Sequence, residues 1–267
     1  MKTSLHGLAR ALGSTGISVS PIGLGTVKIG RDKGVKYPQH FTIPDDDAVR
    51  KLLATAHELG INTLDTAPAY GNSEERLGQL LTNRNEWIIV SKAGETFADG
   101  VSQFDFTAEH ITASIERSLK RLKTDYIDVL LIHSDGNDLP IANDLVLWEQ
   151  LETLKSKGLI RAFGLSGKTV EGGISALQKS DCAMVTFNLN EQSEKPVLTY
   201  AEQQNKGVFV KKALASGHVC NNAERSPLEA SFDLVFSQPA VASAIIGTIN
   251  LDHLKQNVEI AVNSLTR

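Results

Sequence analysis

The sequence predicts an eight-stranded parallel α/β barrel. Eight short apolar runs recur along the 267 residues, and an amphipathic segment with helical spacing follows each of them. Most of the runs are continuous and rich in Val, Ile and Leu, as expected for parallel strands that are buried on both faces. The length also matches the ~250 residues typical of a (β/α)₈ barrel. A doubly wound sheet shares the local pattern, but no GxGxxG follows the first run, so it is the second choice.

The individual elements follow from these runs and from their capping residues. Thr107 is a candidate N-cap, and Gly60 is a candidate C-terminal cap. The predicted strands are 20–26, 61–66, 87–92, 128–133, 161–166, 184–188, 207–212 and 243–248. The predicted helices are 45–59, 73–81, 107–122, 144–157, 169–178, 194–205, 227–236 and 251–262. Residues 9–21 predict a β-hairpin that turns at 14–16 and plugs the bottom of the barrel. No linker or composition shift divides the chain, so we expect a single domain over 1–267.

Composition excludes several classes of function. The net charge is -4, which offers no basic field for nucleic acid. Cys182 and Cys220 show no CxxC spacing, and the seven histidines show no paired-ligand spacing, so neither a disulfide framework nor a metal site is expected. No signal peptide begins the sequence, and no apolar stretch reaches the ~20 residues of a membrane span. We therefore expect a soluble, cytoplasmic protein.

Four reactive side chains are predicted to meet at one mouth of the barrel. Asp65 ends the second strand, Tyr70 lies in the loop after it, Lys92 ends the third strand, and His133 ends the fourth. The carboxyl ends of barrel strands form the active-site face. Each residue alone could have a structural role. Together they indicate catalysis, because a lysine near the barrel axis is costly unless a group such as Asp65 pairs with it.

These residue types suit proton transfer to oxygen. An ammonium about 4 Å from a phenol, at an effective dielectric near 20, favours the phenolate by roughly 4 kcal/mol. Lys92 would therefore make Tyr70 a usable acid and base near neutral pH, while His133 holds a carbonyl oxygen beside it. Such a site can protonate an oxygen as hydride arrives at carbon, but it contains no hydride source. A cofactor is therefore required.

The segments around these residues resemble the aldo-keto reductases. They are GINTLDTAPAYGNSEERLGQLL, IIVSKAG and DYIDVLLIHS, with LGSTGISVSPIGLGT at the start and IIGTINLDHLKQNVE at the end. The resemblance runs nearly end to end. It implies a (β/α)₈ barrel that usually binds NADPH, with Tyr70 as general acid/base. It further implies that Lys92 and Asp65 support Tyr70 and that His133 orients the substrate.

The same resemblance implies a set of cofactor contacts, some at the nicotinamide and some at the phosphates and adenine. Phosphate is expected at a helix N-terminus after the eighth strand. The implied residues are Gly25, Thr26, Asp65, Ser166, Lys211, Leu214, Ser216, Gly247, Thr248, Gln256 and Asn257.

Several of these positions depart from the family's usual contacts. The residue after Ser166 is Gly167 rather than asparagine, Met184 replaces a glutamine, and Lys211 stands where an aromatic ring often stacks. Gly247 and His253 stand where a lysine and an arginine often grip the 2′-phosphate. Because histidine is only partly charged at neutral pH, we expect a weaker preference for NADPH and use of NADH as well.

The loops indicate the substrate and leave alternatives open. The loop over 93–106 carries Phe97, Phe104 and Phe106, and the loop after His133 is short and polar. We expect an open pocket for small polar aldehydes or sugar-like hydroxyl compounds. One alternative is a non-catalytic, nicotinamide-binding regulatory barrel. A second is a phosphate-handling lyase or isomerase that uses Lys92 as a Schiff base.

Overall fold

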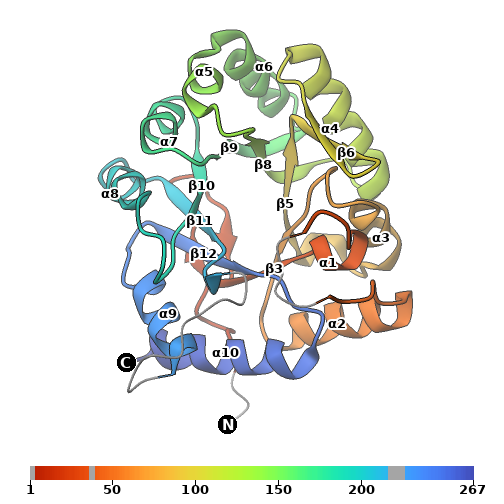
Figure 1. Cartoon of the computed structure of the whole chain (residues 1–267), viewed down its shortest axis with the longest axis vertical. Coiled ribbons are helices and arrows are strands. Elements are labelled where there is room, and N and C mark those ends of the chain that lie inside the picture. Colours follow the sequence, from red (N-terminus) through yellow and green to blue (C-terminus); the bar gives the residue numbers. More distant parts are fainter. Residues whose placement is uncertain (1–3, 36–39, 216–225) are drawn as a thin grey trace.

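The computed structural model describes residues 4–35, 40–215 and 226–267. Eight parallel strands close into a barrel, and they follow one another around it in chain order. Helices surround the barrel (Figure 1). The predicted (β/α)₈ architecture is thus confirmed.

Each barrel strand coincides with one of the eight predicted runs. The sixth and the eighth begin two residues earlier than predicted, at Cys182 and Val241. The strands are β3 (Ile22–Gly25), β4 (Thr63–Asp65), β5 (Ile88–Ala93), β8 (Ile127–His133), β9 (Ile160–Ser166), β10 (Cys182–Thr186), β11 (Gly207–Lys211) and β12 (Val241–Ile246).

The predicted helices are all present, and both predicted capping residues lie at helix ends. The Thr107 side chain accepts from the His110 amide, as predicted for an N-cap. Gly60 has a φ of +84°, the left-handed conformation that glycine adopts after a helix. The helices are α2 (Asp46–Glu58), α3 (Ser73–Leu80), α4 (Ala108–Leu122), α6 (Leu145–Ser156), α7 (Val170–Leu177), α8 (Lys195–Gln203), α9 (Pro227–Phe236) and α10 (Leu251–Leu265).

The N-terminal hairpin closes the bottom of the barrel, as predicted. Its strands β1 (Arg10–Ala11) and β2 (Ser18–Val19) pair antiparallel. Leu12 and Val19 are fully buried, in one cluster with barrel residues such as Met184 and Phe209. Apolar side chains of the hairpin therefore seal the end of the barrel opposite the strand carboxyl ends.

Five elements in the loops were not predicted. They are α1 (Val27–Gly30), the 3₁₀ turn η1 (Arg84–Glu86), α5 (Asp138–Asn143) and a hairpin of β6 (Glu95–Ala98) and β7 (Val101–Phe104). The hairpin replaces the loop expected over 93–106. Its two-residue turn, Asp99–Gly100, has positive φ at both positions, which is the hairpin signature of an Asp-Gly pair.

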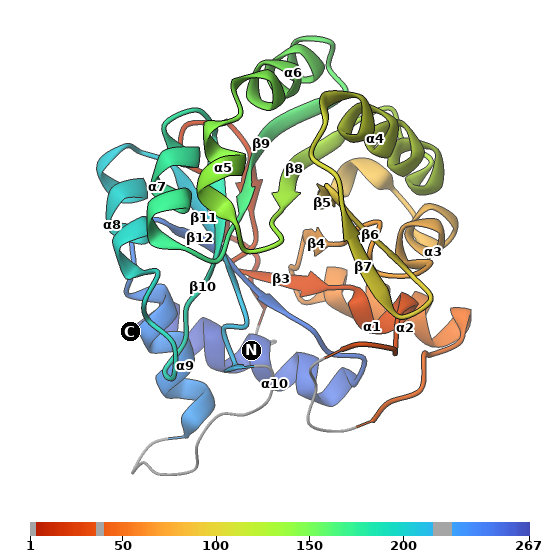
Figure 2. The same ribbon diagram turned by 45° about the horizontal axis from the view of Figure 1, so that its top comes forward.

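The β6–β7 hairpin lies beside α1 at the mouth of the barrel (Figure 2). The Arg31 guanidinium, directly after α1, lies 3.2 Å from the centroid of the Phe97 ring on β6. This contact joins the loop after β3 to the hairpin after β5. The two segments together form one wall of the mouth.

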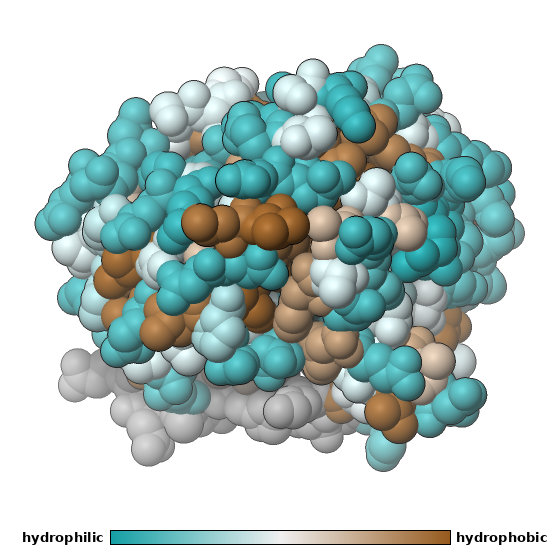
Figure 3. Space-filling view, turned by 90° about the horizontal axis from the view of Figure 1, so that it is seen from above, coloured by the Kyte–Doolittle hydropathy of each residue, from teal (hydrophilic) through white to brown (hydrophobic). Residues whose placement is uncertain are grey.

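Hydrophilic residues cover most of the face drawn in Figure 3, with smaller hydrophobic patches between them. Within residues 4–35, 40–215 and 226–267, none of the helices has the length and hydropathy that a membrane span requires.

Candidate active site

Asp65 and Lys92 form a buried ion pair at the ends of two neighbouring barrel strands. The Nζ atom of Lys92 lies 2.5 Å from Oδ1 of Asp65 and also donates to the Thr66 carbonyl at 3.0 Å. Both side chains are almost completely buried. The strand register explains their meeting, because Asp65 at the end of β4 pairs with Val90 on β5. The ammonium predicted to be costly near the barrel axis is thus compensated.

Tyr70 lies in front of this pair, in the loop between β4 and α3. Its hydroxyl donates to Oδ2 of Asp65 at 3.5 Å, and the Lys92 ammonium lies 4.7 Å from the centroid of its ring. Tyr70 lines the cleft, whereas Lys92 is buried behind it. A ligand in the cleft can therefore reach the phenol but is screened from the lysine.

His133, at the end of β8, completes the predicted group of four. Its ring lies edge-on to that of Tyr70, with 6.4 Å between the centroids. The Nδ1 atom lies 2.6 Å from Oε2 of Glu95 on β6. Burial lowers the pKa of His133 below its usual 6.5, although the Glu95 carboxylate opposes that shift. The structure thus brings Asp65, Tyr70, Lys92 and His133 together.

Glu95 is a site residue that the sequence interpretation missed. Burial alone would raise its pKa, but His133, Ser102 and Arg31 outweigh burial and lower it to about 2. The Ser102 hydroxyl, on the opposite strand of the hairpin, donates to Oε1 of Glu95 at 2.6 Å. The sequence held one signal for this residue. Glu95 is a carboxylate three residues after the strand-end Lys92, and it precedes the Asp99–Gly100 turn.

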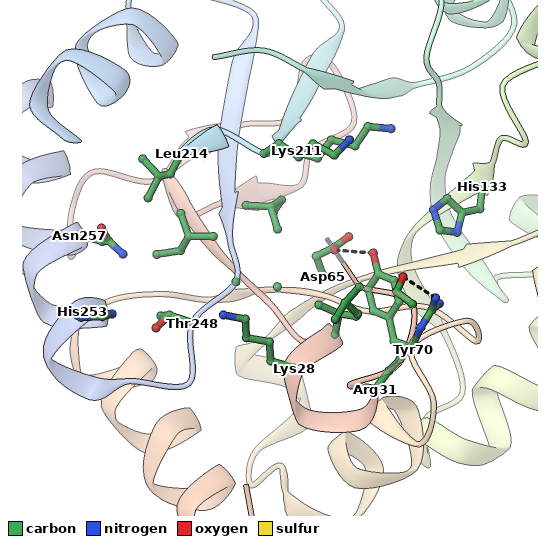
Figure 4. Close-up of a pocket in the computed structure, with 18 of the residues that line it drawn as sticks. Lys28, Arg31, Asp65, Tyr70, His133, Lys211, Leu214, Thr248, His253 and Asn257 are labelled. Atoms are coloured by element: carbon green, nitrogen blue, oxygen red, sulfur yellow. Dashed lines mark hydrogen bonds between the residues drawn. The ribbon is translucent and has the colours of Figure 1, made fainter. Parts of the chain in front are cut away.

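A long cavity of about 900 Å³ connects this group with α10. Tyr70 and His133 lie at one end of it, and His253 and Asn257 lie at the other (Figure 4). Lys28 and Lys212 also line the cavity. Its size is within the range of cofactor sites, and its extended shape and positive lining fit a dinucleotide with its phosphates.

Most of the residues expected to bind the cofactor lie along this cavity, but two lie behind its wall. The Thr26 hydroxyl is buried and donates to the Asp65 carbonyl at 2.9 Å. The Ser166 hydroxyl is buried and accepts from Nζ of Lys211 at 3.0 Å. Ser216 lies outside the described residues. The residues that line the cavity are Gly25, Asp65, Lys211, Leu214, Gly247, Thr248, Gln256 and Asn257.

The N-terminus of α10 is capped from within the chain. The Asn250 side chain accepts from the amides of Asp252 and His253, at 2.8 and 3.1 Å, and the Asn250 amide donates to Oγ1 of Thr248. Two of the amides expected to face phosphate therefore have partners already. Gln256 and Asn257, one turn further along, line the cavity.

The residues that differ from the family's usual nicotinamide contacts also have defined positions in the structure. Met184 is buried in the barrel interior with the residues of the N-terminal hairpin. Nζ of Lys211 donates to Oγ of Ser166 and, at 2.7 Å, to the Gly167 carbonyl. Burial lowers the pKa of Lys211, and the Glu194 carboxylate opposes that shift. In the part of the chain that the structure describes, no three His, Cys, Asp or Glu side chains are placed to hold a metal ion.

A tyrosine in front of a buried carboxylate–ammonium pair, at the mouth of a (β/α)₈ barrel with an extended cavity, defines a class of barrel oxidoreductases. The comparison with known families agrees with that class. A profile of the Aldo/keto reductase family matches residues 21–227, and the chain belongs to this family.

Solved and curated relatives match much of the chain. A solved protein from Pseudomonas aeruginosa, assigned to the aldo-keto reductases, is 56% identical with a TM-score of 0.90, and the match covers 99% of each chain. The L-galactose dehydrogenase of Arabidopsis thaliana is 32% identical over 78% of this chain and 66% of its own length. The D-arabinose 1-dehydrogenase of Saccharomyces cerevisiae is 30% identical over 76% of this chain and 60% of its own length. The chain thus spans less than two thirds of either dehydrogenase.

Proposed function

We propose that this protein is an NAD(P)(H)-dependent oxidoreductase that interconverts small polar or sugar-like carbonyl compounds and their alcohols. The proposal rests on one observation. The Tyr70 phenol faces the cavity with the buried Asp65–Lys92 pair directly behind it. This arrangement gives an otherwise weak acid a charged support, and proton transfer to a carbonyl oxygen needs such an acid.

Each residue of the group has a defined task in this reaction. A bound nicotinamide supplies the hydride for reduction and accepts it in oxidation. Tyr70 donates a proton to the carbonyl oxygen in reduction and takes it from the hydroxyl in oxidation. The Lys92 charge favours the phenolate, and Asp65 holds the ammonium in place. The His133 ring lies edge-on to that of Tyr70. His133 binds the substrate oxygen from the side opposite to Tyr70.

We propose NADPH as the cofactor, with NADH as an alternative. His253 lines the far end of the cavity, where the resemblance expects an arginine against the 2′-phosphate. Histidine lacks the permanent charge and the forked donors of arginine. The 2′-phosphate of NADPH therefore contributes less to the binding free energy at this end of the cavity. Lys28 and Lys212 offer positive charge along the cavity, and both cofactors share the pyrophosphate that such charge would bind.

The substrate class follows from the polar mouth. Glu95, Ser102 and Ser134 line the cavity near His133, and Phe104 is the aromatic contribution of the hairpin. Hydrogen-bonding groups around the reacting oxygen suit a substrate with neighbouring hydroxyls. The names of two relatives, L-galactose dehydrogenase and D-arabinose 1-dehydrogenase, support a sugar-like substrate.

The test is a scan of NADPH and NADH oxidation, and of the reverse reaction, across small aldehydes and aldoses. We expect turnover by the wild type and a loss of roughly 10²- to 10⁴-fold in Tyr70→Phe. The variant should still bind NADPH with the affinity of the wild type, as measured by quenching of protein fluorescence. No turnover by the wild type, or equal turnover by the variant, would overturn the proposal. A steep preference for bulky apolar ketones would overturn the substrate class alone.

A further inference from the structure

The β6–β7 hairpin brings a carboxylate to the rim of the candidate site. Oε2 of Glu95 lies 2.6 Å from Nδ1 of His133, and the two side chains are 11% and 21% exposed. The hairpin itself holds Glu95 in place, because Ser102 donates to its other oxygen at 2.6 Å. Arg31, packed on Phe97 of the same hairpin, adds a positive charge nearby.

This contact restricts the imidazole. Nδ1 and Oε2 lie at ion-pair distance, but the ring N–H is not aligned with the carboxylate oxygen as a formed hydrogen bond requires. An ionised carboxylate only accepts hydrogen bonds, so a neutral His133 has to present Nδ1–H to Glu95. The other nitrogen, Nε2, then carries the lone pair. A protonated ring instead donates from both nitrogens. The position of Glu95 therefore decides which nitrogen meets the substrate and in which role.

We propose that Glu95 is a positioning residue that fixes the orientation and the tautomer of His133, leaving Nε2 for the oxygen of the substrate. This inference rests on the proposed oxidoreductase function. A protonated ring presents Nε2–H, which donates to the oxygen of the carbonyl compound and equally to that of its alcohol, so the ring keeps its proton in both directions while Tyr70 transfers its own. A neutral ring presents the Nε2 lone pair, which can accept only from a hydroxyl.

The charges around His133 make Glu95 the group that favours protonation. Lys92 on β5 and Lys211 on β11 disfavour the imidazolium, and Tyr70 faces the ring edge-on without a charge in its phenol form. Glu95 is the carboxylate in contact with the ring. Replacing Glu95 by glutamine removes that negative charge, so the protonated ring should exist only at lower pH.

The first experiment reads the tautomer directly and needs no turnover. Histidine-labelled protein is examined by ¹⁵N NMR at pH 8, and the His133 signal is identified by its loss in His133→Asn. We expect the Nδ1–H tautomer in the wild type and a gain of the Nε2–H tautomer in Glu95→Gln. Glu109→Gln is the matched control, since it makes the same substitution at an exposed carboxylate of α4 and should keep the wild-type tautomer. An Nε2–H tautomer in the wild type, or an unchanged spectrum in Glu95→Gln, would overturn the proposal.

The second experiment reads the consequence in catalysis. Losing the partner that orients a metal-bound histidine commonly costs roughly 10- to 100-fold, and we expect a loss of that order in kcat/KM for carbonyl reduction by Glu95→Gln. The pH at which reduction declines should also move lower, whereas NADPH affinity stays the same and Glu95→Asp recovers part of the rate. An unchanged pH profile would overturn the role of Glu95. A wild type that turned nothing over would instead defeat the proposed function, and the NMR result would still decide the role of Glu95.

Discussion

Asp65 and Lys92 are ion-paired at 2.5 Å with side chains that are 6% and 2% exposed, so each neutralises a charge that the barrel could not otherwise hold. Removing one partner of a buried pair commonly costs about 3–5 kcal/mol, since the other charge is left buried and uncompensated. We expect Lys92→Met to lower the free energy of unfolding by that amount in urea denaturation. The double variant Asp65→Asn/Lys92→Met should recover most of the loss. Additive losses from the two changes would contradict the coupling.

The far end of the cavity offers a test of cofactor preference. An arginine in place of His253 would bring a permanent charge and forked donors to the cavity wall. Hydrogen bonds to charged groups contribute about 1.5–3 kcal/mol, so His253→Arg should tighten NADPH binding by roughly 10- to 100-fold and leave NADH binding unchanged. Titration of protein fluorescence with each cofactor measures both constants. His253→Gln is the control, and equal tightening for the two cofactors would refute the assignment of this end to the 2′-phosphate.

Glu95 should also leave a signature in stability against pH. Its folded pKa is lowered from 4.5 to about 2. A lowered carboxyl pKa contributes stability that is fully present above pH 4.5 and is lost as the pH falls from 4.5 toward 2. The wild type should therefore lose stability relative to Glu95→Gln over that window. Urea midpoints at pH 6, 4.5 and 3 measure the difference, and a constant difference would show that the carboxylate has no such role.

Gly30, at the end of α1, touches the loop that carries Tyr70. A Cβ atom at this glycine would lie 2.3 Å from the Tyr70 carbonyl and 2.4 Å from the Ser73 amide, and both are backbone atoms. Gly30→Ala should therefore displace Tyr70 and lower kcat by roughly 10²-fold, the cost of a small misplacement of a reacting group. Gly173→Ala is the control, because the three atoms nearest to its Cβ would all belong to the Val197 side chain rather than to the backbone. Wild-type kcat in Gly30→Ala would show that the loop adapts.

Periodicity and strand ends predicted the barrel and the group of four, for a physical reason. Parallel strands deliver their last residues to one edge, so Asp65, Lys92 and His133 could be placed together from their positions in the runs alone. Whether the side chain of a residue near a strand end faces the cavity or is buried in the protein interior is harder to predict. Thr26 directly follows β3 and Ser166 ends β9, yet their hydroxyls are buried against Asp65 and Lys211.

The contact between Glu95 and His133 could not be predicted, since it depends on how a hairpin outside the barrel folds over the mouth. The Asp99–Gly100 turn is a strong hairpin signal in itself. The angle at which that hairpin meets the barrel depends on Arg31 and Phe97, which are far apart in the chain. Tertiary packing of this kind has no short-range pattern in a single sequence.

Because of the N-terminal hairpin, the barrel is open to solvent at one end and closed by apolar side chains at the other. With Leu12 and Val19 packed against Met184 and Phe209, water and solutes have no route through the floor. Substrate, product and cofactor must then share the opening above Tyr70. The ligand that binds deepest in this opening must therefore bind first and be released last. The closed end of the barrel thus implies an ordered binding and release of ligands.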